Sequence, residues 1–527
     1  MKHFLHLLPA LAVLSSAALG QDFNDDGYRD LAIGAPGEDI NGAADAGAVH
    51  VLYGSMNGLT GTSDQFLHQD ADGIFDTAEP GDRFGSALAY GDFDSDGFDD
   101  LAVGVPYQDK AGKANAGMVQ VFYGSATGLG TAKQQLLSLD DYNMSGPSAA
   151  GDQFGKALCS GDFNGDGRQD LAIGIPYDDV SGVTDAGSVR VVYGGGIFFN
   201  LDTGTAQSWS QANCGGGELL EAGDHFGWSL AAESFNGFDA NGWRCEDLAI
   251  GVPDEDLNGV SNCGAVHVLA GSSTKLTSAG SQLWHQDHPN MIGGNDPGDN
   301  FGYSLAAGDF SSDGYFDLAI GAPYEKIYVA YDLNEPFTPL PSAGTVTVIY
   351  GSPAGLSGVG GDLVYQNAYA IQEESEAGDL FGFSLAAGTI DGDQHWDLVI
   401  GIPWESVGSV PAAGAVAVLF GSASGIKFTG NQLWHQDSSG ILGVAEDADG
   451  FGFTVTCADF NADGRMDVAV GAYLEDVDGV LAAGSVSVLR GSNGGLTATG
   501  NQLWTQNSAG VEDSNEMSDT FGSALCQ

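Results

Sequence analysis

One unit of about 70 residues recurs seven times along this chain. A complete unit contains a Phe-Gly pair, an acidic loop, an apolar run that ends in Gly-x-Pro, and a second apolar run. The Phe-Gly pairs begin at residues 84, 154, 226, 301, 381, 451 and 521. The first acidic loop, at Asp22, has no Phe-Gly pair before it, and the last pair, at Phe521, has no acidic loop after it. Joining the two ends restores one complete unit, which predicts a closed ring.

Each unit is expected to form four short antiparallel strands. The first two are exemplified by Phe84–Ala89 and Leu101–Val105, and the outermost by Gln282–Gln286. Small residues on the inner strands and large ones on the outer strand suit a wedge-shaped blade, and such wedges close into a propeller that protects its strand edges. We therefore predict an all-β, seven-bladed β-propeller of four-stranded antiparallel blades. The C-terminal strand, Phe521 to Cys526, is expected to close it by pairing with the N-terminal blade.

The domain organisation is expected to be simple. Residues 1–20 read as a signal peptide, with Lys2, an apolar run and the small-residue site Ala18-Leu19-Gly20. Residues 21–527 are then a single propeller. No other stretch approaches the length of a membrane span. We expect a secreted or cell-surface protein without a membrane span.

Net charge and cysteine content narrow the possible classes of protein further. With 71 acidic and 15 basic residues the formal net charge is −56, which repels nucleic acid and anionic membranes. Six cysteines are too few for a disulfide scaffold. Three are expected to be buried thiols at the ends of first strands: Cys159, Cys457 and Cys526. Any pair among the other three could be bridged, and the sequence does not say which: Cys214, Cys245 and Cys263.

The third unit shows the motif most clearly. It contains Phe154-Gly155, then Asp162-Phe163-Asn164-Gly165-Asp166-Gly167, then Gly174-Ile175-Pro176. This pattern resembles the FG-GAP repeat of the integrin α-subunit propeller, and similar repeats occur in secreted bacterial propellers and in glycosylphosphatidylinositol-specific phospholipase D. The resemblance implies an extracellular propeller with an adhesive role. Departures are Tyr473 in place of a Gly-x-Pro proline, an interrupted fourth loop near Ser234, and Gln394 in place of a loop glycine.

The acidic loops have the spacing of a calcium site. In Asp92-x-Asp94-x-Asp96-Gly97-Phe98-x-Asp100, side-chain oxygens arise at positions 1, 3, 5 and 9 and a backbone carbonyl at position 7. The five best loops contain no His or Cys, which argues against zinc or copper. Asp-Gly segments also form ordinary turns, but five near-perfect copies favour calcium.

We predict about five structural calcium sites. The predicted ligands, with position 7 acting through its backbone carbonyl, are Asp22, Asn24, Asp26, Tyr28 and Asp30; Asp92, Asp94, Asp96, Phe98 and Asp100; Asp162, Asn164, Asp166, Arg168 and Asp170; Asp309, Ser311, Asp313, Tyr315 and Asp317; and Asp459, Asn461, Asp463, Arg465 and Asp467. A weaker loop begins at Thr389 and offers Asp391, Asp393 and Asp397. The interrupted fourth loop is expected to hold no ion, or to hold one weakly.

Strand order assigns the loops to two faces. The acidic loops share one face, and the loops between second and third strands lie on the other, where the largest insertion is Glu325–Ser342. Five aromatic residues begin these second-to-third loops: Tyr107, Tyr177, Tyr324, Trp404 and Tyr473. Rings around a channel mouth suit sugar stacking or protein recognition. They can equally well plug the channel or pack on neighbouring loops. The resemblance to integrins implies that this face binds partners.

The expected function is a calcium-binding, non-catalytic adhesion module for an extracellular protein or glycan. The alternative is an extracellular hydrolase or lyase with its site at the propeller mouth, for which paired carboxylates such as Asp178-Asp179 are available. No nucleophile-elbow or His-Glu-x-x-His signature is present. The chain could also be one module of a larger surface protein. Ligand identity and oligomeric state stay open.

Overall fold

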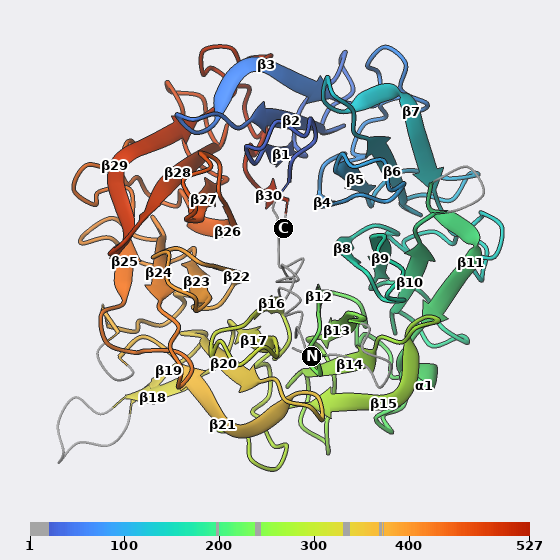
Figure 1. Ribbon diagram of the computed structural model, residues 1–527, viewed down its shortest axis with the longest axis vertical. Helices are drawn as coiled ribbons and strands as arrows, with labels where there is room; N and C mark the ends of the chain where they lie inside the picture. Colours follow the sequence, from blue (N-terminus) through green and yellow to red (C-terminus); the bar gives the residue numbers. More distant parts are fainter. Residues whose placement is uncertain are drawn as a thin grey trace, which may run out of the picture.

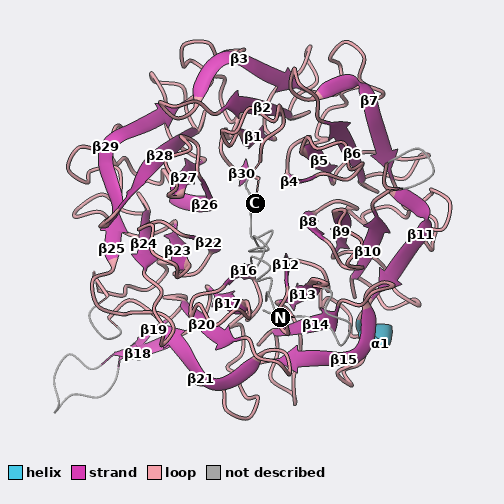
Figure 2. Ribbon diagram, viewed as in Figure 1, coloured by secondary structure: helices cyan, strands magenta, loops and turns pink. Residues whose placement is uncertain are grey.

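Seven four-stranded antiparallel sheets stand around a central axis in the computed structural model, which describes residues 21–195, 200–237, 244–329, 338–367, 371–372 and 374–526 (Figure 1). Nearly all regular structure in this part of the chain is strand (Figure 2). The predicted seven-bladed propeller is confirmed. The expected signal peptide, residues 1–20, lies outside the described residues.

The blades are numbered along the chain and their strands are given from the axis outward. Blade 1 contains β30 (Ala524–Leu525), β1 (Leu31–Ala35), β2 (Ala48–Tyr53) and β3 (Thr60–Leu67); blade 2 contains β4 (Ala87–Gly91), β5 (Asp100–Val105), β6 (Met118–Tyr123) and β7 (Gly130–Leu137); blade 3 contains β8 (Ala157–Gly161), β9 (Asp170–Ile175), β10 (Ser188–Tyr193) and β11 (Asp202–Trp209). Blade 4 contains β12 (Leu230–Glu233), β13 (Asp247–Val252), β14 (Ala265–Ala270) and β15 (Thr277–Trp284); blade 5 contains β16 (Ser304–Gly308), β17 (Asp317–Ala322), β20 (Thr345–Tyr350) and β21 (Ser357–Val364). Blade 6 contains β22 (Ser384–Gly388), β23 (Asp397–Ile402), β24 (Ala415–Leu419) and β25 (Gln432–Trp434); blade 7 contains β26 (Phe451–Ala458), β27 (Asp467–Ala472), β28 (Ser485–Ser492) and β29 (Gly495–Trp504).

Blade 1 combines the two ends of the described chain. β30 pairs with β1 through Ile33↔Leu525 and Gly34↔Ala524. The strand is shorter than the Phe521–Cys526 expected from the sequence. In blades 1 to 6 the Phe-Gly pair lies just before the innermost strand, and only in blade 7 does the strand begin at the pair, at Phe451. The Phe-Gly pair therefore mainly forms the connection into the innermost strand rather than part of that strand.

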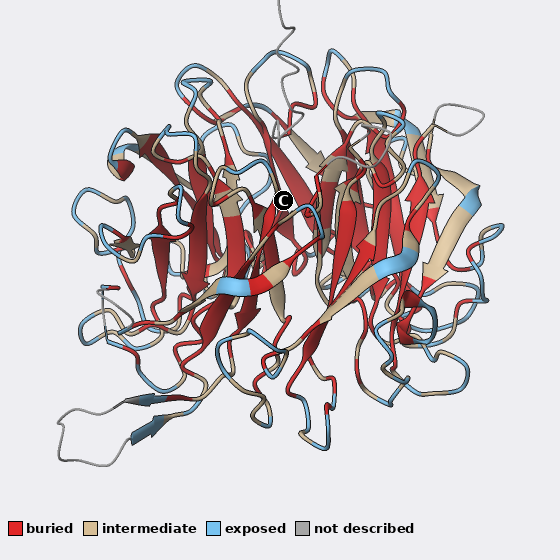
Figure 3. Cartoon of the chain, turned by 60° about the horizontal axis from the view of Figure 1, so that its bottom comes forward, coloured by how far each residue is buried: buried red, intermediate tan, exposed pale blue. Residues whose placement is uncertain are grey.

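Both faces of each blade are buried against neighbours, which is why its two middle strands are mostly apolar. Val49 and Val51 of β2 pack with Leu101 and Val103 of blade 2, whereas Leu52 packs with Trp504 of blade 7. The alternation along β2 thus divides its side chains between two interfaces rather than between core and solvent. In Figure 3 the strands are largely buried and exposure gathers in the loops.

Glycines allow the blades to meet closely beside the axis. A Cβ at Gly471 of blade 7 would lie 2.1 Å from the carbonyl oxygen of Gly522, the glycine of the last Phe-Gly pair, which has a φ of 88°. Gly34 of blade 1 meets Gly85 of blade 2 in the same way, at 2.2 Å. The glycines of the two motifs are therefore partners across each blade junction, because only a residue without Cβ fits there.

Two features lie outside the blade pattern. The insertion after β17 forms the hairpin of β18 (Ile327–Val329) and β19 (Thr338–Leu340), which projects from the ring (Figure 3); Tyr331 and Phe337, which lie within it, are outside the described residues. The helix α1 (Gln211–Cys214) follows β11. Among the described residues no helix is long and apolar enough to cross a membrane.

The cysteines partly follow expectation. Cys214 and Cys263 are free thiols, so no pair in the fourth-unit cluster is bridged. The Cys214 Sγ lies 3.2 Å from His267 Nδ1. Cys526 is buried as expected, whereas Cys159 and Cys457 are only half-buried, because they lie on inner strands near the central channel.

Candidate functional site: acidic loops and an aromatic mouth

The acidic loops fold around their own carboxylates. In blade 1, Asp22 accepts hydrogen bonds from the backbone N–H groups of Asp26 (3.1 Å) and Gly27 (3.0 Å). The Asn24 amide oxygen accepts from Asp26 N–H at 2.9 Å. The Tyr28 N–H donates to Asp26 Oδ1 at 3.0 Å. The loops of blades 2, 3, 5 and 7 repeat the pair of bonds to the first aspartate. The spacing thus directs several oxygens toward the inside of one tight loop.

The ninth position ties each loop to its blade. Asp30 is fully buried and accepts from Phe23 N–H at 2.8 Å and Gly54 N–H at 3.0 Å, joining the loop to the end of β2. Burial raises the pKa of Asp30 to about 8, and the neighbouring carboxylates Asp22 and Asp26 add to the rise. The equivalent aspartates of blades 2, 3 and 5 show the same rise in pKa to about 8: Asp100, Asp170 and Asp317. An added cation would relieve this unfavourable burial of charge.

The acidic loop of blade 2 holds a compact group of carboxylates. Oxygens of Asp92, Asp94 and Asp100 lie within 4.8 Å of one another. All donors in this loop are oxygens, the set that a hard divalent cation prefers. Lys133 donates a hydrogen bond to Asp94 from a side chain that is 52% exposed. A lysine this exposed has room to leave the carboxylate.

The fourth and sixth loops depart from the pattern as the sequence indicates. In the fourth, Ser234 takes the first position and its hydroxyl donates to the Gly237 carbonyl at 2.6 Å. Asp247 nevertheless keeps the bonds of the ninth position, from Phe235 N–H and Gly271 N–H. The ninth aspartate is therefore a structural residue even without a complete loop. In the sixth, Asp391 and Asp393 accept only from the backbone N–H groups that follow them.

The loops are also joined to one another around the ring. The N–H of the eighth position in each loop donates to the first-position carbonyl of the preceding blade, over 2.9–3.4 Å. The Asp99 N–H bonds to the Asp22 carbonyl, and the Arg29 N–H closes the circle on the Asp459 carbonyl. Order in one loop is therefore transmitted to the next.

The opposite face carries an arc of aromatic rings. The five predicted rings are all half-buried at the starts of their loops: Tyr107, Tyr177, Tyr324, Trp404 and Tyr473. Four others join them, and sequence reasoning missed these: Trp228, Tyr303, Phe383 and Phe453. Each of the four directly follows a Phe-Gly pair, and this shared position is the sequence pattern from which they could have been predicted. Blades 1, 2 and 3 have Ser523, Ser86 and Lys156 there instead.

Ring contacts run through blades 4 to 7. The centroids of Trp228 and Tyr303 are 5.5 Å apart, Tyr303 and Phe383 5.2 Å, and Phe383 and Phe453 5.0 Å. Tyr324 meets Tyr303 edge-on at 5.6 Å. Phe453 lies 3.9 Å from Tyr473, which meets Trp404 at 6.4 Å. The structure thus brings three predicted rings into the arc, whereas Tyr177 contacts His225 and Tyr107 faces Lys156.

A cavity of about 400 Å³ opens beside the arc between blades 4 and 5. Trp228, Tyr303 and Tyr324 line it together with Asp254 and Asn300. Asn300 Nδ2 donates to Asp254 Oδ1 at 2.8 Å, and His225 Nδ1 lies 2.7 Å from Asp254 Oδ2. A larger cavity of about 660 Å³ lies among polar outer loops near Asp140 and Lys275, away from the arc. The smaller one combines ring faces with fixed polar groups, as binding sites do.

These features define a seven-bladed β-propeller with acidic loops on one face and an aromatic mouth on the other. The model of the FG-GAP repeat matches residues 13–52, 84–122, 154–192, 301–349 and 451–489. The chain therefore carries FG-GAP repeats in five places, consistent with an integrin-α-like propeller.

Relatives are similar over part of their length. Phosphatidylinositol-glycan-specific phospholipase D of Bos taurus is 36% identical over 186 residues, 35% of this chain and 21% of that protein. Integrin alpha-PS2 of Drosophila melanogaster is 27% identical over 255 residues, 47% of this chain and 15% of that protein. The matched segments thus span about a fifth or less of these relatives. The solved structure of Pseudomonas aeruginosa periplasmic gluconolactonase has a TM-score of 0.44 at 11% identity, covering 93% of this chain and 97% of that one.

Proposed function

We propose that this protein is an extracellular, non-catalytic binding module, stabilised by calcium, whose aromatic mouth takes an extracellular protein or glycan. The observation that carries the proposal is the arc of half-buried rings from Trp228 to Tyr473, with a cavity at one end. Half-buried rings offer large apolar area at little cost in side-chain entropy, and aromatic anchors dominate binding energy. Similarity to integrin α subunits, and the leader expected at residues 1–20, support an extracellular setting.

Calcium fits the loops of blades 1, 2, 3 and 5. Their first, third, fifth and ninth side chains and the seventh carbonyl would hold the ion, which would supply positive charge to crowded carboxylates. Burial, with the neighbouring carboxylates, raises the pKa of the ninth aspartates of blades 1, 3 and 5, so a bound cation would stabilise their charged forms. Because each loop is bonded to the next, we assign the ions a structural role.

The test is a glycan and extracellular-matrix protein array probed with the calcium-loaded protein and again with excess chelator. Trp228→Ala and Tyr324→Ala each remove a ring from the cavity, and we expect at least about tenfold weaker binding to any ligand found. Tyr142→Ala is the matched control, since this ring is 78% exposed on an outer loop. Binding that survives both mouth variants would contradict the proposed surface. Hydrolysis or elimination of an arrayed compound would favour an enzyme instead.

A further inference from the structure

Arg490 occupies a position that is never basic in the other six blades. It pairs with Thr497, as Tyr53 pairs with Thr60 in blade 1. The residues at this position in blades 1 to 6 are Tyr53, Tyr123, Tyr193, Ala270, Tyr350 and Phe420. The tyrosine hydroxyls bond to side chains of the outer strand, as Tyr123 does to Gln135 at 2.8 Å. Blade 7 therefore places a guanidinium where its neighbours place a neutral side chain.

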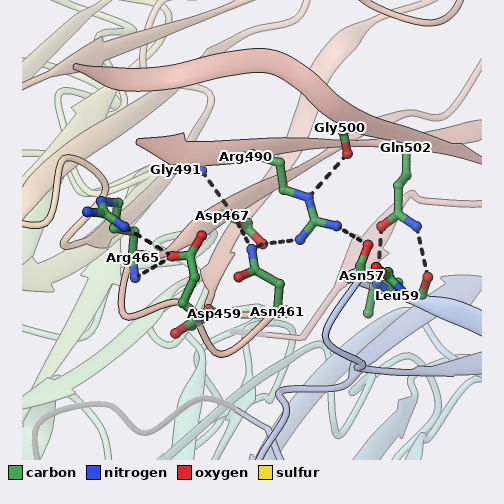
Figure 4. A network of polar contacts seen from close by, with 12 residues as sticks. Asn57, Leu59, Asp459, Asn461, Arg465, Asp467, Arg490, Gly491, Gly500 and Gln502 are labelled. Carbon is green, nitrogen blue, oxygen red and sulfur yellow. Dashed lines mark hydrogen bonds and ion pairs between the residues drawn. The ribbon is translucent and has the colours of Figure 1, made fainter. Parts of the chain in front are cut away.

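The guanidinium is held on three sides (Figure 4). Nη1 donates to Asp467 Oδ2, the ninth-position carboxylate of the acidic loop, at 2.9 Å. Nε donates to the Gly500 carbonyl at 3.2 Å, and Nη2 donates to the Asn57 carbonyl of blade 1. The Arg490 side chain is 10% exposed and that of Asp467 is fully buried. The pair is thus fixed in place, unlike the half-exposed Lys133 beside the loop of blade 2.

The rest of the seventh loop adapts to this cation. Asn461 turns its amide nitrogen to Asp467, with Nδ2 at 3.1 Å from Oδ2 and 3.4 Å from Oδ1. In blade 3 the equivalent Asn164 instead accepts, through its amide oxygen, from Asp166 N–H at 2.8 Å. Two side-chain N–H donors therefore face the carboxylate that a metal ion would have to share. A divalent cation added there would meet the buried positive charge of Arg490. The third-position residue, Asn461, turns its amide nitrogen rather than its oxygen toward Asp467.

We infer that the Arg490 guanidinium takes the place of calcium in blade 7, so that the loop Asp459–Asp467 binds no metal ion. The inference departs from the expectation of a calcium site in that loop, and it rests on calcium binding by the loops of blades 1, 2, 3 and 5. Since Arg490 also reaches Asn57, the side chain that neutralises the seventh loop joins blade 7 to blade 1. Gln502 completes the junction, donating to the Leu59 carbonyl at 2.8 Å and accepting from Leu59 N–H at 3.1 Å. The junction at which the ring closes is therefore held by a cation that chelators cannot remove.

The experiment counts bound calcium by equilibrium dialysis with elemental analysis. Arg490→Tyr introduces the residue of blades 1, 2, 3 and 5 and is expected to bind one ion more than the wild type. The double variant Arg490→Tyr/Asp459→Asn should lose that ion again. Lys427→Gln is the control for net charge, because it removes an exposed cation from blade 6, and its stoichiometry should equal that of the wild type.

Single loop variants keep the test decisive if Arg490→Tyr fails to fold. Asp92→Asn in blade 2 should cost one ion, whereas Asp459→Asn in blade 7 should cost none. Loss of an ion from Asp459→Asn, or an unchanged count in folded Arg490→Tyr, would overturn the inference and leave calcium binding elsewhere intact. A wild-type protein that binds no calcium would overturn the calcium assignment itself and this inference with it.

Hydrogen exchange gives a second readout within one molecule. The Gly491 N–H bonds to Asp467 at 2.9 Å, as Gly54, Gly124 and Gly194 bond to the ninth aspartates of blades 1 to 3. Chelator should accelerate exchange at Gly54, Gly124 and Gly194 by about tenfold or more. Exchange at Gly491 should accelerate less than at these three, because Arg490 stays bonded to Asp467 when the ions are removed. Acceleration at Gly491 equal to that at the other three would contradict the replacement of calcium by Arg490.

Discussion

At the scale of single residues, buried carboxyl groups recur at the blade junctions on the aromatic face. Glu475 of blade 7 accepts a hydrogen bond from Gln436 of blade 6, and the same Gln–Glu contact joins Gln506 to Glu38. Burial, with Asp449 as the next cause, raises the pKa of Glu475 to about 8. The junction of blades 1 and 2 makes the contact without a charge, between Gln69 and Gln108. The fold therefore accepts a neutral amide at this position.

Glu475→Gln should flatten the dependence of stability on pH. The folded state holds the proton up to about pH 8, whereas the unfolded chain releases it near its ordinary pKa of 4.5. The folded state thus binds more protons between these values, so Glu475 makes the wild type less stable as pH rises from about 4.5 to 8. We expect the variant to have the higher Tm at pH 8, by about 1 °C or more.

The measurement is a set of thermal melts from pH 5 to 9. Gln108→Glu provides the reverse substitution and should steepen the decline with pH. Parallel profiles for Glu475→Gln and the wild type would show that this carboxyl does not titrate as its burial indicates.

At the scale of elements, the Gly-x-Pro segment of one blade and the Phe-Gly pair of the next blade meet across a blade junction. The second strand brings its glycine against the glycine of the next Phe-Gly pair, as Gly471 meets Gly522. The acidic loop, between first and second strands, bonds to the loop of the neighbouring blade. The paired glycines and the acidic loops therefore each stabilise an interface between two blades.

Gly471→Ala should be strongly destabilising. Its Cβ would lie 2.1 Å from the Gly522 carbonyl oxygen, so the junction of blades 7 and 1 must open. We expect the free energy of unfolding to fall by about 2 kcal/mol or more, measured by urea denaturation. Gly494→Ala is the matched control, since a Cβ there has nothing within 4 Å. Equal stability of the two variants would contradict the close approach.

At the scale of the whole molecule, a ring of blades bonded loop to loop should respond to calcium as a unit. Four occupied sites at about 100 times their Kd would stabilise the fold by roughly 2.7 kcal/mol each. For a chain of this size we therefore expect excess chelator to lower Tm by about 10 °C, measured by calorimetry. Restored calcium should reverse the shift and magnesium should not, because magnesium demands a stricter octahedron. An unchanged melt in chelator would count against ions in the loops.

The repeat pattern is sufficient to predict most of the fold. Seven spaced copies of Phe-Gly, acidic loop and Gly-x-Pro predict seven wedges, because a unit with two apolar faces must be covered on both sides. The loop spacing likewise places carboxylates inside a tight turn, since that geometry is local. Strand order alone assigns the five loop aromatics to the correct face.

The packing of the blades, in contrast, decides which of these residues meet. Trp228 and Tyr303 are 75 positions apart in the sequence, yet they share one cavity because inner strands of successive blades lie side by side. Arg490 looks like an ordinary strand residue, and its contact with Asp467 arises only when β28 folds beside its loop. Periodicity fixes which residues are equivalent, whereas contact between blades depends on how the sheets pack around the axis.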